Sequence, residues 1–95
     1  MTEQELDKLL AKTKLSLGIY DDGSDSTIRQ KIMEAISFLE LNGISEEVLL
    51  GNEAGTTAIV ILTADTWKTG GEYKLSPAIE WYISRLYSET RLEAK

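Results

Sequence analysis

The sequence predicts an all-α protein, a small bundle of about four helices with a short helical turn near residues 45–50. Apolar residues recur at three- and four-residue spacing over several segments, which is the period of an α-helix. Residues that cap helices precede most of these segments, and glycines follow the first two. The chain has 95 residues, which is enough for one domain over residues 1–95.

The first helix is expected over residues 3–15. Thr2 and Glu5 form a capping-box pattern, in which each side chain accepts a hydrogen bond from the other residue's backbone amide. Leucines then recur at helical spacing, and Gly18 is a natural end for the helix.

The second helix is expected over residues 25–42, because five apolar residues fall on one helical face. These residues are Ile28, Ile32, Ala35, Ile36 and Leu39.

An acidic turn, YDDGSD, lies just before this second helix. We predict that Asp25 caps the helix, with Ser24, Ser26 or a Thr27–Gln30 capping box as alternatives. A calcium loop of the EF-hand type needs glycine at position 6 and glutamate at position 12, and no register within the turn supplies them. The stretch is therefore interpreted as a turn rather than a metal site.

The middle of the chain contains a short turn and an ambiguous apolar segment. Ser45 can cap a helical turn, and the two glutamates behind it suit the positive end of a helix. The β-branched residues of the segment over residues 55–68 favour a strand, whereas its length favours a buried helix. We predict a helix, because a lone strand would have no partner in this chain.

The last helix is expected over residues 76–92. Ser76 is its N-cap, and Pro77 occupies the first helical position, where a missing amide hydrogen is harmless. The core face of this helix is formed by Ile79, Tyr82, Ile83 and Leu86.

Trp81 falls almost opposite that core face, on the side that carries Arg85 and Ser88. Either a loop covers the indole, or the face is a subunit interface, where tryptophan and arginine are enriched. Tyr73 and Tyr87 could extend such an interface.

The composition argues against most enzyme chemistry. The chain contains no cysteine and no histidine, which excludes thiolate zinc sites, cysteine nucleophiles and histidine-based triads. We expect no catalytic residue, no metal and no cofactor, although a carboxylate-based enzyme or metal-dependent protein stays open as an alternative. Without a membrane span or a signal peptide, we expect a soluble intracellular protein that contacts no membrane.

The charge is acidic, with a formal net value of −6. Between residues 32 and 67 the chain carries six acidic residues and no Lys or Arg. Proteins that bind nucleic acid tightly need a basic surface, so sequence-specific DNA binding is not expected. The acidic residues form either a solvated surface or a surface past which a polyanion slides, and the candidates are Glu40, Glu46, Glu47 and Glu53.

The order of these features resembles the small head–tail connector (adaptor) proteins of tailed bacteriophages and prophages. The resemblance begins with LLAKTKLSLGIYDDGSDSTIRQKIMEAISFL, a short helix followed by LGI, an acidic turn and a long amphipathic helix. It continues through NGIS and an apolar third segment to a last helix, LSPAIEWYISRLY, and covers residues 9–87. The order and spacing of the parts carry the resemblance rather than any single motif.

This resemblance implies a structural protein without catalytic residues. Connector subunits are short helical bundles that assemble as a ring beneath the portal, extend the DNA channel and dock the next neck or tail component. It implies as partners further copies of the chain, the portal protein, a neck or tail completion protein, and double-stranded DNA that passes through without specific binding. The expected location is the virion neck, or the host cytoplasm during assembly. The loop TGGEYKL is shorter here than the arm that relatives often carry.

A second hypothesis is a small intracellular helical regulatory or protein-binding adaptor module, such as a helix-turn-helix relative. The number of helices favours it, whereas the acidic balance of the last helix argues against duplex DNA as its target.

Overall fold

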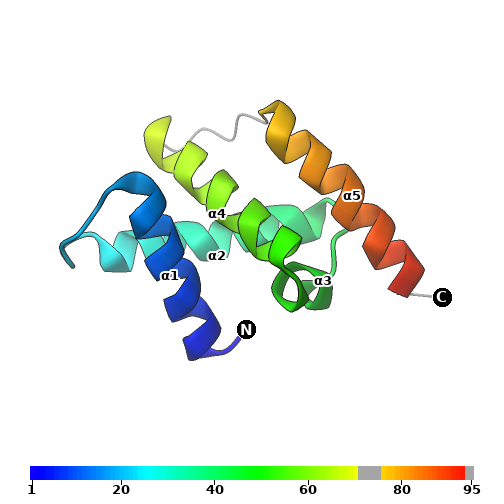
Figure 1. Ribbon diagram of the computed structural model, residues 1–95, viewed down its shortest axis with the longest axis horizontal. Helices are drawn as coiled ribbons and strands as arrows, with labels where there is room; N and C mark the ends of the chain where they lie inside the picture. The colour runs from blue at the N-terminus through cyan, green and yellow to red at the C-terminus, as the bar shows by residue number, and fades with distance from the viewer. Residues whose placement is uncertain (71–75, 94–95) are drawn as a thin grey trace.

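The computed structural model describes residues 1–70 and 76–93 (Figure 1). These residues form five helices and no strand: α1 (Glu3–Leu17), α2 (Asp25–Leu41), α3 (Glu46–Gly51), α4 (Glu53–Lys68) and α5 (Pro77–Glu93). The all-α prediction is therefore confirmed. Each predicted helix lies within two residues of its observed bounds, and the turn near residues 45–50 is α3.

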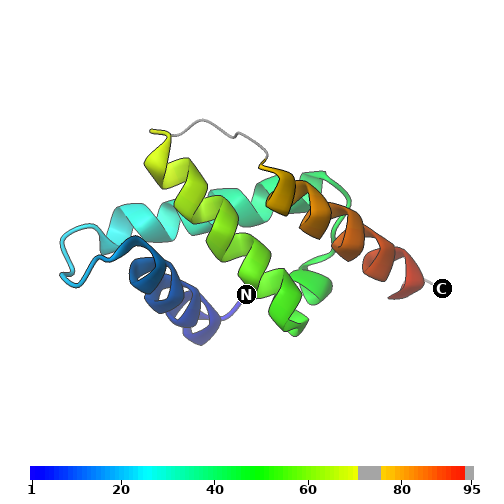
Figure 2. The ribbon, with the colours of Figure 1, turned by 45° about the horizontal axis from the view of Figure 1, so that its top comes forward.

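The helix α4 lies in the middle of the bundle and contacts the other four helices (Figures 1 and 2). Its buried residues are Gly55, Ala58, Ile59, Leu62, Thr63, Ala64 and Thr66. Together with the partly buried Ala54, Val60, Ile61 and Trp67, they spread around most of its circumference. A helix covered on several sides needs no single apolar stripe, which is why periodicity alone left this segment ambiguous. The helix prediction for residues 55–68 is confirmed, and the helix begins two residues earlier.

Two buried threonines of α4 satisfy their hydroxyl groups within the helix. Thr63 Oγ1 donates to the carbonyl oxygen of Ile59 at 2.7 Å, and Thr66 Oγ1 donates to that of Leu62 at 2.8 Å. This bonding to the preceding turn lets β-branched polar residues enter the core without an unpaired donor.

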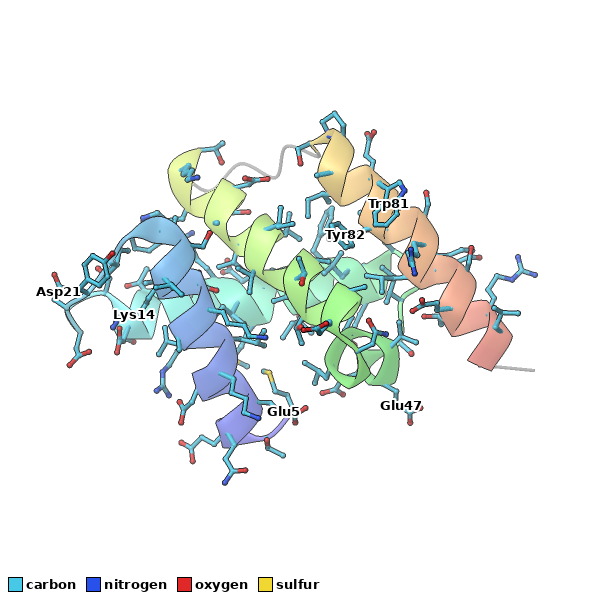
Figure 3. All side chains as sticks on the ribbon, viewed as in Figure 1. Glu5, Lys14, Asp21, Glu47, Trp81 and Tyr82 are labelled. Atoms are coloured by element: carbon cyan, nitrogen blue, oxygen red, sulfur yellow. The ribbon has the colours of Figure 1, made fainter. Side chains whose placement is uncertain are left out.

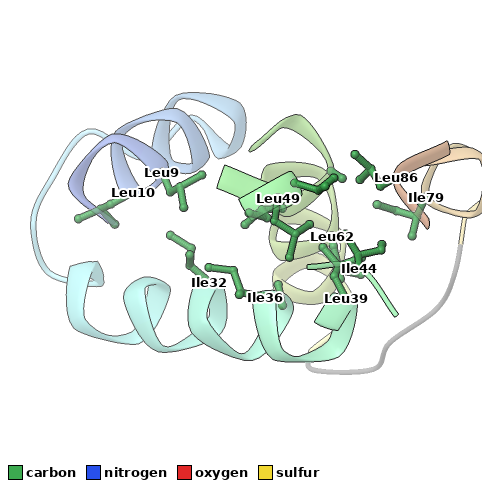
Figure 4. Close-up of a cluster of buried hydrophobic side chains, with 14 of the residues drawn as sticks. Leu9, Leu10, Ile32, Ile36, Leu39, Ile44, Leu49, Leu62, Ile79 and Leu86 are labelled. Atoms are coloured by element: carbon green, nitrogen blue, oxygen red, sulfur yellow. The ribbon is translucent and has the colours of Figure 1, made fainter. Parts of the chain in front are cut away.

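One contiguous cluster of apolar side chains forms the core (Figure 4). The five apolar residues predicted for one face of α2 are all buried, as are Leu9 and Leu10 of α1 and Ile79 and Leu86 of α5. Truncating a fully buried residue such as Leu62 to alanine would cost about 2–5 kcal/mol of stability.

Three of the four predicted helix caps are present. At α1 the capping box is complete, because Glu5 N donates to Thr2 Oγ1 at 3.1 Å and Thr2 N donates to Glu5 Oε1 at 2.9 Å. These hydrogen bonds from Thr2 hold the pKa of Glu5 below its usual value. Ser45 accepts a bond from Val48 N at 3.2 Å, and Ser76 accepts one from Ile79 N at 3.4 Å.

The prediction that Asp25 caps α2 was wrong. The N-cap residue is Ser24, whose side chain makes no capping bond, and Asp25 is the first residue of the helix. The physical reason is an ion pair: Asp25 Oδ1 lies 2.7 Å from Lys14 Nζ. The carboxylate still lies in the first turn, where the helix dipole favours negative charge.

The end of α1 shows why the helix exceeds its expected length. Gly18 adopts a left-handed conformation with φ of 72°, and its amide donates to Leu15 while that of Ile19 donates to Lys14. The glycine therefore lies just beyond the helix, and residues 16 and 17 remain helical.

The helices α3 and α4 meet at a sharp corner that has almost no loop. Asn52 is the residue between them, and its Oδ1 accepts a hydrogen bond from Gly55 N at 2.8 Å. A Cβ atom at Gly55 would lie 2.3 Å from the carbonyl oxygen of Leu49 and 2.6 Å from that of Val48. The backbones of the two helices are therefore in contact at Gly55.

Replacing Gly55 with alanine is expected to destabilise the protein by about 1–3 kcal/mol, because the new methyl group must displace backbone rather than a flexible side chain. Urea unfolding followed by circular dichroism measures the change in the free energy of unfolding.

Gly51→Ala is the matched control, since Gly51 is also helical and a Cβ there meets no atom within 4 Å. This variant should be neutral or more stable by up to about 1 kcal/mol, because alanine is the better helix former. Equal stability of the two variants would contradict the close approach at Gly55.

Candidate functional site

The acidic turn YDDGSD, which was considered as a metal site, connects α1 to α2. Lys14 Nζ lies 3.2 Å from Asp22 Oδ1 and 2.7 Å from Asp25 Oδ1, while Asp21 Oδ1 accepts a hydrogen bond from Gly23 N at 3.1 Å (Figure 3). The hydrogen bond with Asp25, and to a smaller extent that with Asp22, raises the pKa of Lys14. The turn thus ties the end of α1 to the start of α2.

The carboxylates do not gather as a metal site would require. Among residues 1–70 and 76–93, no group of three or more potential ligand side chains could hold a metal ion. Nor is any helix in this part of the chain long and apolar enough to cross a membrane.

The strongest candidate for function is the outer face of α5. Trp81 is 54% exposed, and Figure 3 shows Tyr82, rather than Trp81, on the side that faces α4. The ring centroids of Trp81 and Tyr82 are 5.0 Å apart and nearly perpendicular, and the guanidinium of Arg85 lies 5.4 Å from the indole centroid. Edge-to-face and cation–π contacts of this kind restrict the indole while leaving it accessible.

The other residues predicted for this face lie on the same side of α5 as Trp81. Ser84 and Ser88 are exposed, and the Ser88 hydroxyl donates to the carbonyl oxygen of Ser84. Arg85 Nε lies 3.8 Å from Glu89 Oε1, a long contact between exposed groups that contributes little to stability. The face therefore presents an aromatic ring and a cation to solvent.

Two hydrogen bonds fix α5 against the middle of the chain. The amide of Ser45 donates to Thr90 Oγ1 at 3.1 Å, and Asn52 Nδ2 donates to Glu89 Oε2 at 3.3 Å. Together with the buried Ile79 and Leu86, they orient the helix so that Trp81 points away from the core.

Tyr87 does not extend the Trp81 face. It lies about 120° around the helix from Trp81, and its ring packs over Gly43, where an added Cβ would lie 2.7 Å from Tyr87 Cε2. The guanidinium carbon of Arg91 lies 6.0 Å from the centroid of the same ring. Tyr87 thus helps to hold α5 on the turn between α2 and α3. Tyr73, the other predicted contributor, lies outside the described residues.

The acidic candidates are all exposed, but they do not form one uniform surface. Glu40 and Glu46 line the same hollow, and Glu46 with Glu47 lines the next. The amino group of Met1 pairs with Glu46, and this hydrogen bond raises the pKa of the amine. Glu40, Glu46 and Glu47 therefore line two adjoining hollows beside the Met1 amine, which is paired with Glu46.

Glu53 lies apart from the other three. It lines a groove of about 360 Å³ between α1 and the α3–α4 corner, together with Lys8 and Lys12. Its surroundings are therefore of mixed charge, and it is not a member of the acidic group around Met1.

A second exposed face, on α2, was not predicted from the sequence. Met33 is 54% exposed and Leu41 is 87% exposed on the side of α2 that faces away from the core. The sequence already indicated this exposure, because both residues fall outside the stripe of five core residues. Met33 was interpreted only as flanking that stripe.

Comparison of the chain with protein-family models, with curated proteins and with solved structures found no match.

The pKa of Lys14 leads to a test of the α1–α2 junction. The usual value is 10.5 and the folded value is higher, so the contribution to stability is complete below about pH 10.5 and is lost as the pH rises through the folded pKa. The stability difference between wild type and Lys14→Gln should therefore shrink above that pH in thermal unfolding.

Lys14→Arg is the control, because a guanidinium stays protonated throughout this range. Its advantage over Lys14→Gln should persist at alkaline pH, because it does not depend on the protonation of an amine. A wild-type advantage that does not change with pH would contradict the assignment.

The contact between Asn52 and Glu89 leads to a second test. Asn52→Asp keeps an oxygen that can accept from Gly55 N but removes the donor to Val48 O and Glu89 Oε2. We expect a loss of about 1–3 kcal/mol at neutral pH, because a partly buried acceptor is left unpaired beside a like charge. Urea unfolding measures it.

Adding Glu89→Gln to Asn52→Asp should recover part of the loss, since an amide can donate to the new carboxylate. A double variant no more stable than the single variant would show that the bond to α5 contributes nothing.

Proposed function

We propose that the protein is a structural subunit resembling phage head–tail connectors. In this role copies of the chain form a ring under the portal, extend the DNA channel and dock the next neck or tail component. The observation that carries the proposal is the exposed Trp81–Arg85 pair on a firmly anchored helix.

The character of this pair supports a role in protein contact. Tryptophan and arginine are the residue types most enriched at interface hot spots, and a side chain that is already restricted loses less entropy on binding. Arg85 holds the indole and Tyr82 supports it from the side, so little reorganisation is needed before a partner binds.

The charge supports a conduit rather than a DNA-binding protein. The net charge of −6 is unfavourable for phosphate contacts, and tight binding would stall DNA in a channel. Glu40, Glu46 and Glu47 are the best candidates for a surface that DNA passes, because they line adjoining hollows in which the Met1 amine is the one cation among the described residues. Glu53 is a weaker candidate, since Lys8 and Lys12 line the same groove.

The partners that follow from this role are further copies of the chain, the portal protein and a neck or tail completion protein. The role places the protein in the virion neck, and in the host cytoplasm before assembly.

The proposal predicts association that depends on concentration or on the portal. Sedimentation velocity over a wide concentration range, with electron microscopy of the densest samples, should detect rings, either of the chain alone or on the portal protein encoded near its gene. Trp81→Ala should weaken association about tenfold or more, as expected for a hot-spot residue, without changing the thermal unfolding midpoint.

The control is Tyr20→Ala, which removes an exposed aromatic ring from the α1–α2 turn, away from α5. It should associate like wild type. A chain that remains monomeric at every concentration and ignores the portal would contradict the proposal, and tight salt-sensitive binding to duplex DNA in a gel-shift assay would favour the regulatory alternative.

A further inference from the structure

The outer face of α2 carries a stripe of residues at helical spacing, in which only Phe38 packs partly against the core. The stripe lines an open hollow of about 580 Å³ and consists of Gln30, Met33, Glu34, Ser37, Phe38 and Leu41. Met33 and Leu41 are more than half exposed, so the helix has an apolar row on each of two sides. Contiguous exposed apolar surface rimmed by polar groups marks interaction sites in soluble proteins.

Each of the two faces carries one exposed charged group of opposite sign, Glu34 on α2 and Arg85 on α5. Glu34 makes no ion pair with any described residue, and Glu40 lies one turn beyond Ser37 on the same side. On α5, Arg85 lies beside Trp81, whereas Arg91 lies over the ring of Tyr87, and Glu80 and Glu89 balance the two arginines in charge. Because Arg85 makes only a 3.8 Å contact with Glu89, it can exchange that partner at little cost.

The two faces cannot meet within one copy. Leu39 of α2 and Leu86 of α5 both point into the core, so the stripe and the Trp81 face point outward from different helices (Figure 4). Two complementary faces that lie apart on one chain produce head-to-tail contacts, and such contacts close into rings when the rotation between copies allows it.

We infer that a second copy of this chain binds to the outer face of α2, with its Trp81 against Met33 and Leu41 and its Arg85 beside Glu34. This inference rests on the proposed ring and specifies which two faces form the subunit contact. A portal or neck protein would account for only one of the two exposed faces. A second copy accounts for both, because its indole fits the apolar residues of the stripe and its Arg85 is the charge partner that Glu34 lacks.

Disulfide crosslinking tests the contact directly, because the chain has no cysteine of its own. Ser37→Cys places a thiol within the α2 stripe, and Ser84→Cys places one on the Trp81 face; both serines are exposed. Under oxidising conditions, at ring-forming concentration or on the portal, the double variant should give a ladder of dimers, trimers and larger species in non-reducing gels. A disulfide forms only between Cα atoms within about 7 Å, so the ladder reports proximity.

The single variants and a displaced pair are the controls. Ser84→Cys alone should give no efficient dimer, because the faces meet head to tail. Ser16→Cys combined with Ser84→Cys should give no ladder, since Ser16 is exposed on α1, outside the stripe. Efficient dimers of Ser84→Cys alone would indicate that α5 pairs with α5 and would overturn the inference.

A substitution in the stripe provides a second readout. Met33→Lys removes apolar surface and repels Arg85, so it should weaken self-association about tenfold or more. Leu15→Lys, the same kind of change at an exposed apolar residue of α1, should not. If wild type forms rings and Met33→Lys forms them equally well, the α2 contact is wrong but the connector role stands. If wild type neither associates nor binds the portal, the connector role itself fails.

Discussion

The structure depends on the corner between α3 and α4. The side chain of Asn52 closes both helices there, because it accepts from Gly55 N and donates to the carbonyl oxygen of Val48 at 2.9 Å. The absent side chain at Gly55 lets the two backbones touch, so the chain reverses without a loop. This reversal directs α4 into the centre of the bundle, where the other four helices cover it.

The same corner determines which residues of α5 are exposed to solvent. Asn52 also donates to Glu89, and the amide of Ser45, just before α3, donates to Thr90, so the carboxyl-terminal half of α5 is held from two sides. With Ile79 and Leu86 buried, the rotation of α5 about its axis is fixed. The exposure of Trp81 therefore follows from the packing of residues elsewhere on the helix.

Local periodicity predicted most of the fold and about half of the candidate site. The five core residues of α2 and the capping box at Thr2 follow from spacing, because their partners lie within a few residues. Periodicity could not place Asp25, whose partner Lys14 comes from another helix, or pair Asn52 with Glu89, which lies 37 residues away. The sequence places Met33 and Leu41 outside the core face of α2, but only the structure shows that no other helix covers them.

The proposed contact between copies also bears on where the acidic residues would lie in a ring. If a neighbouring copy covers Met33 and pairs with Glu34, Glu40 lies at the border of that contact, since it lines the hollow that adjoins Met33. Glu46 lines the same hollow, so both carboxylates would lie beside the joint between neighbouring subunits. Repetition around a ring would then place Glu40 and the Glu46–Met1 ion pair at every joint, and the net negative charge at each joint would repel the phosphate backbone evenly along its path.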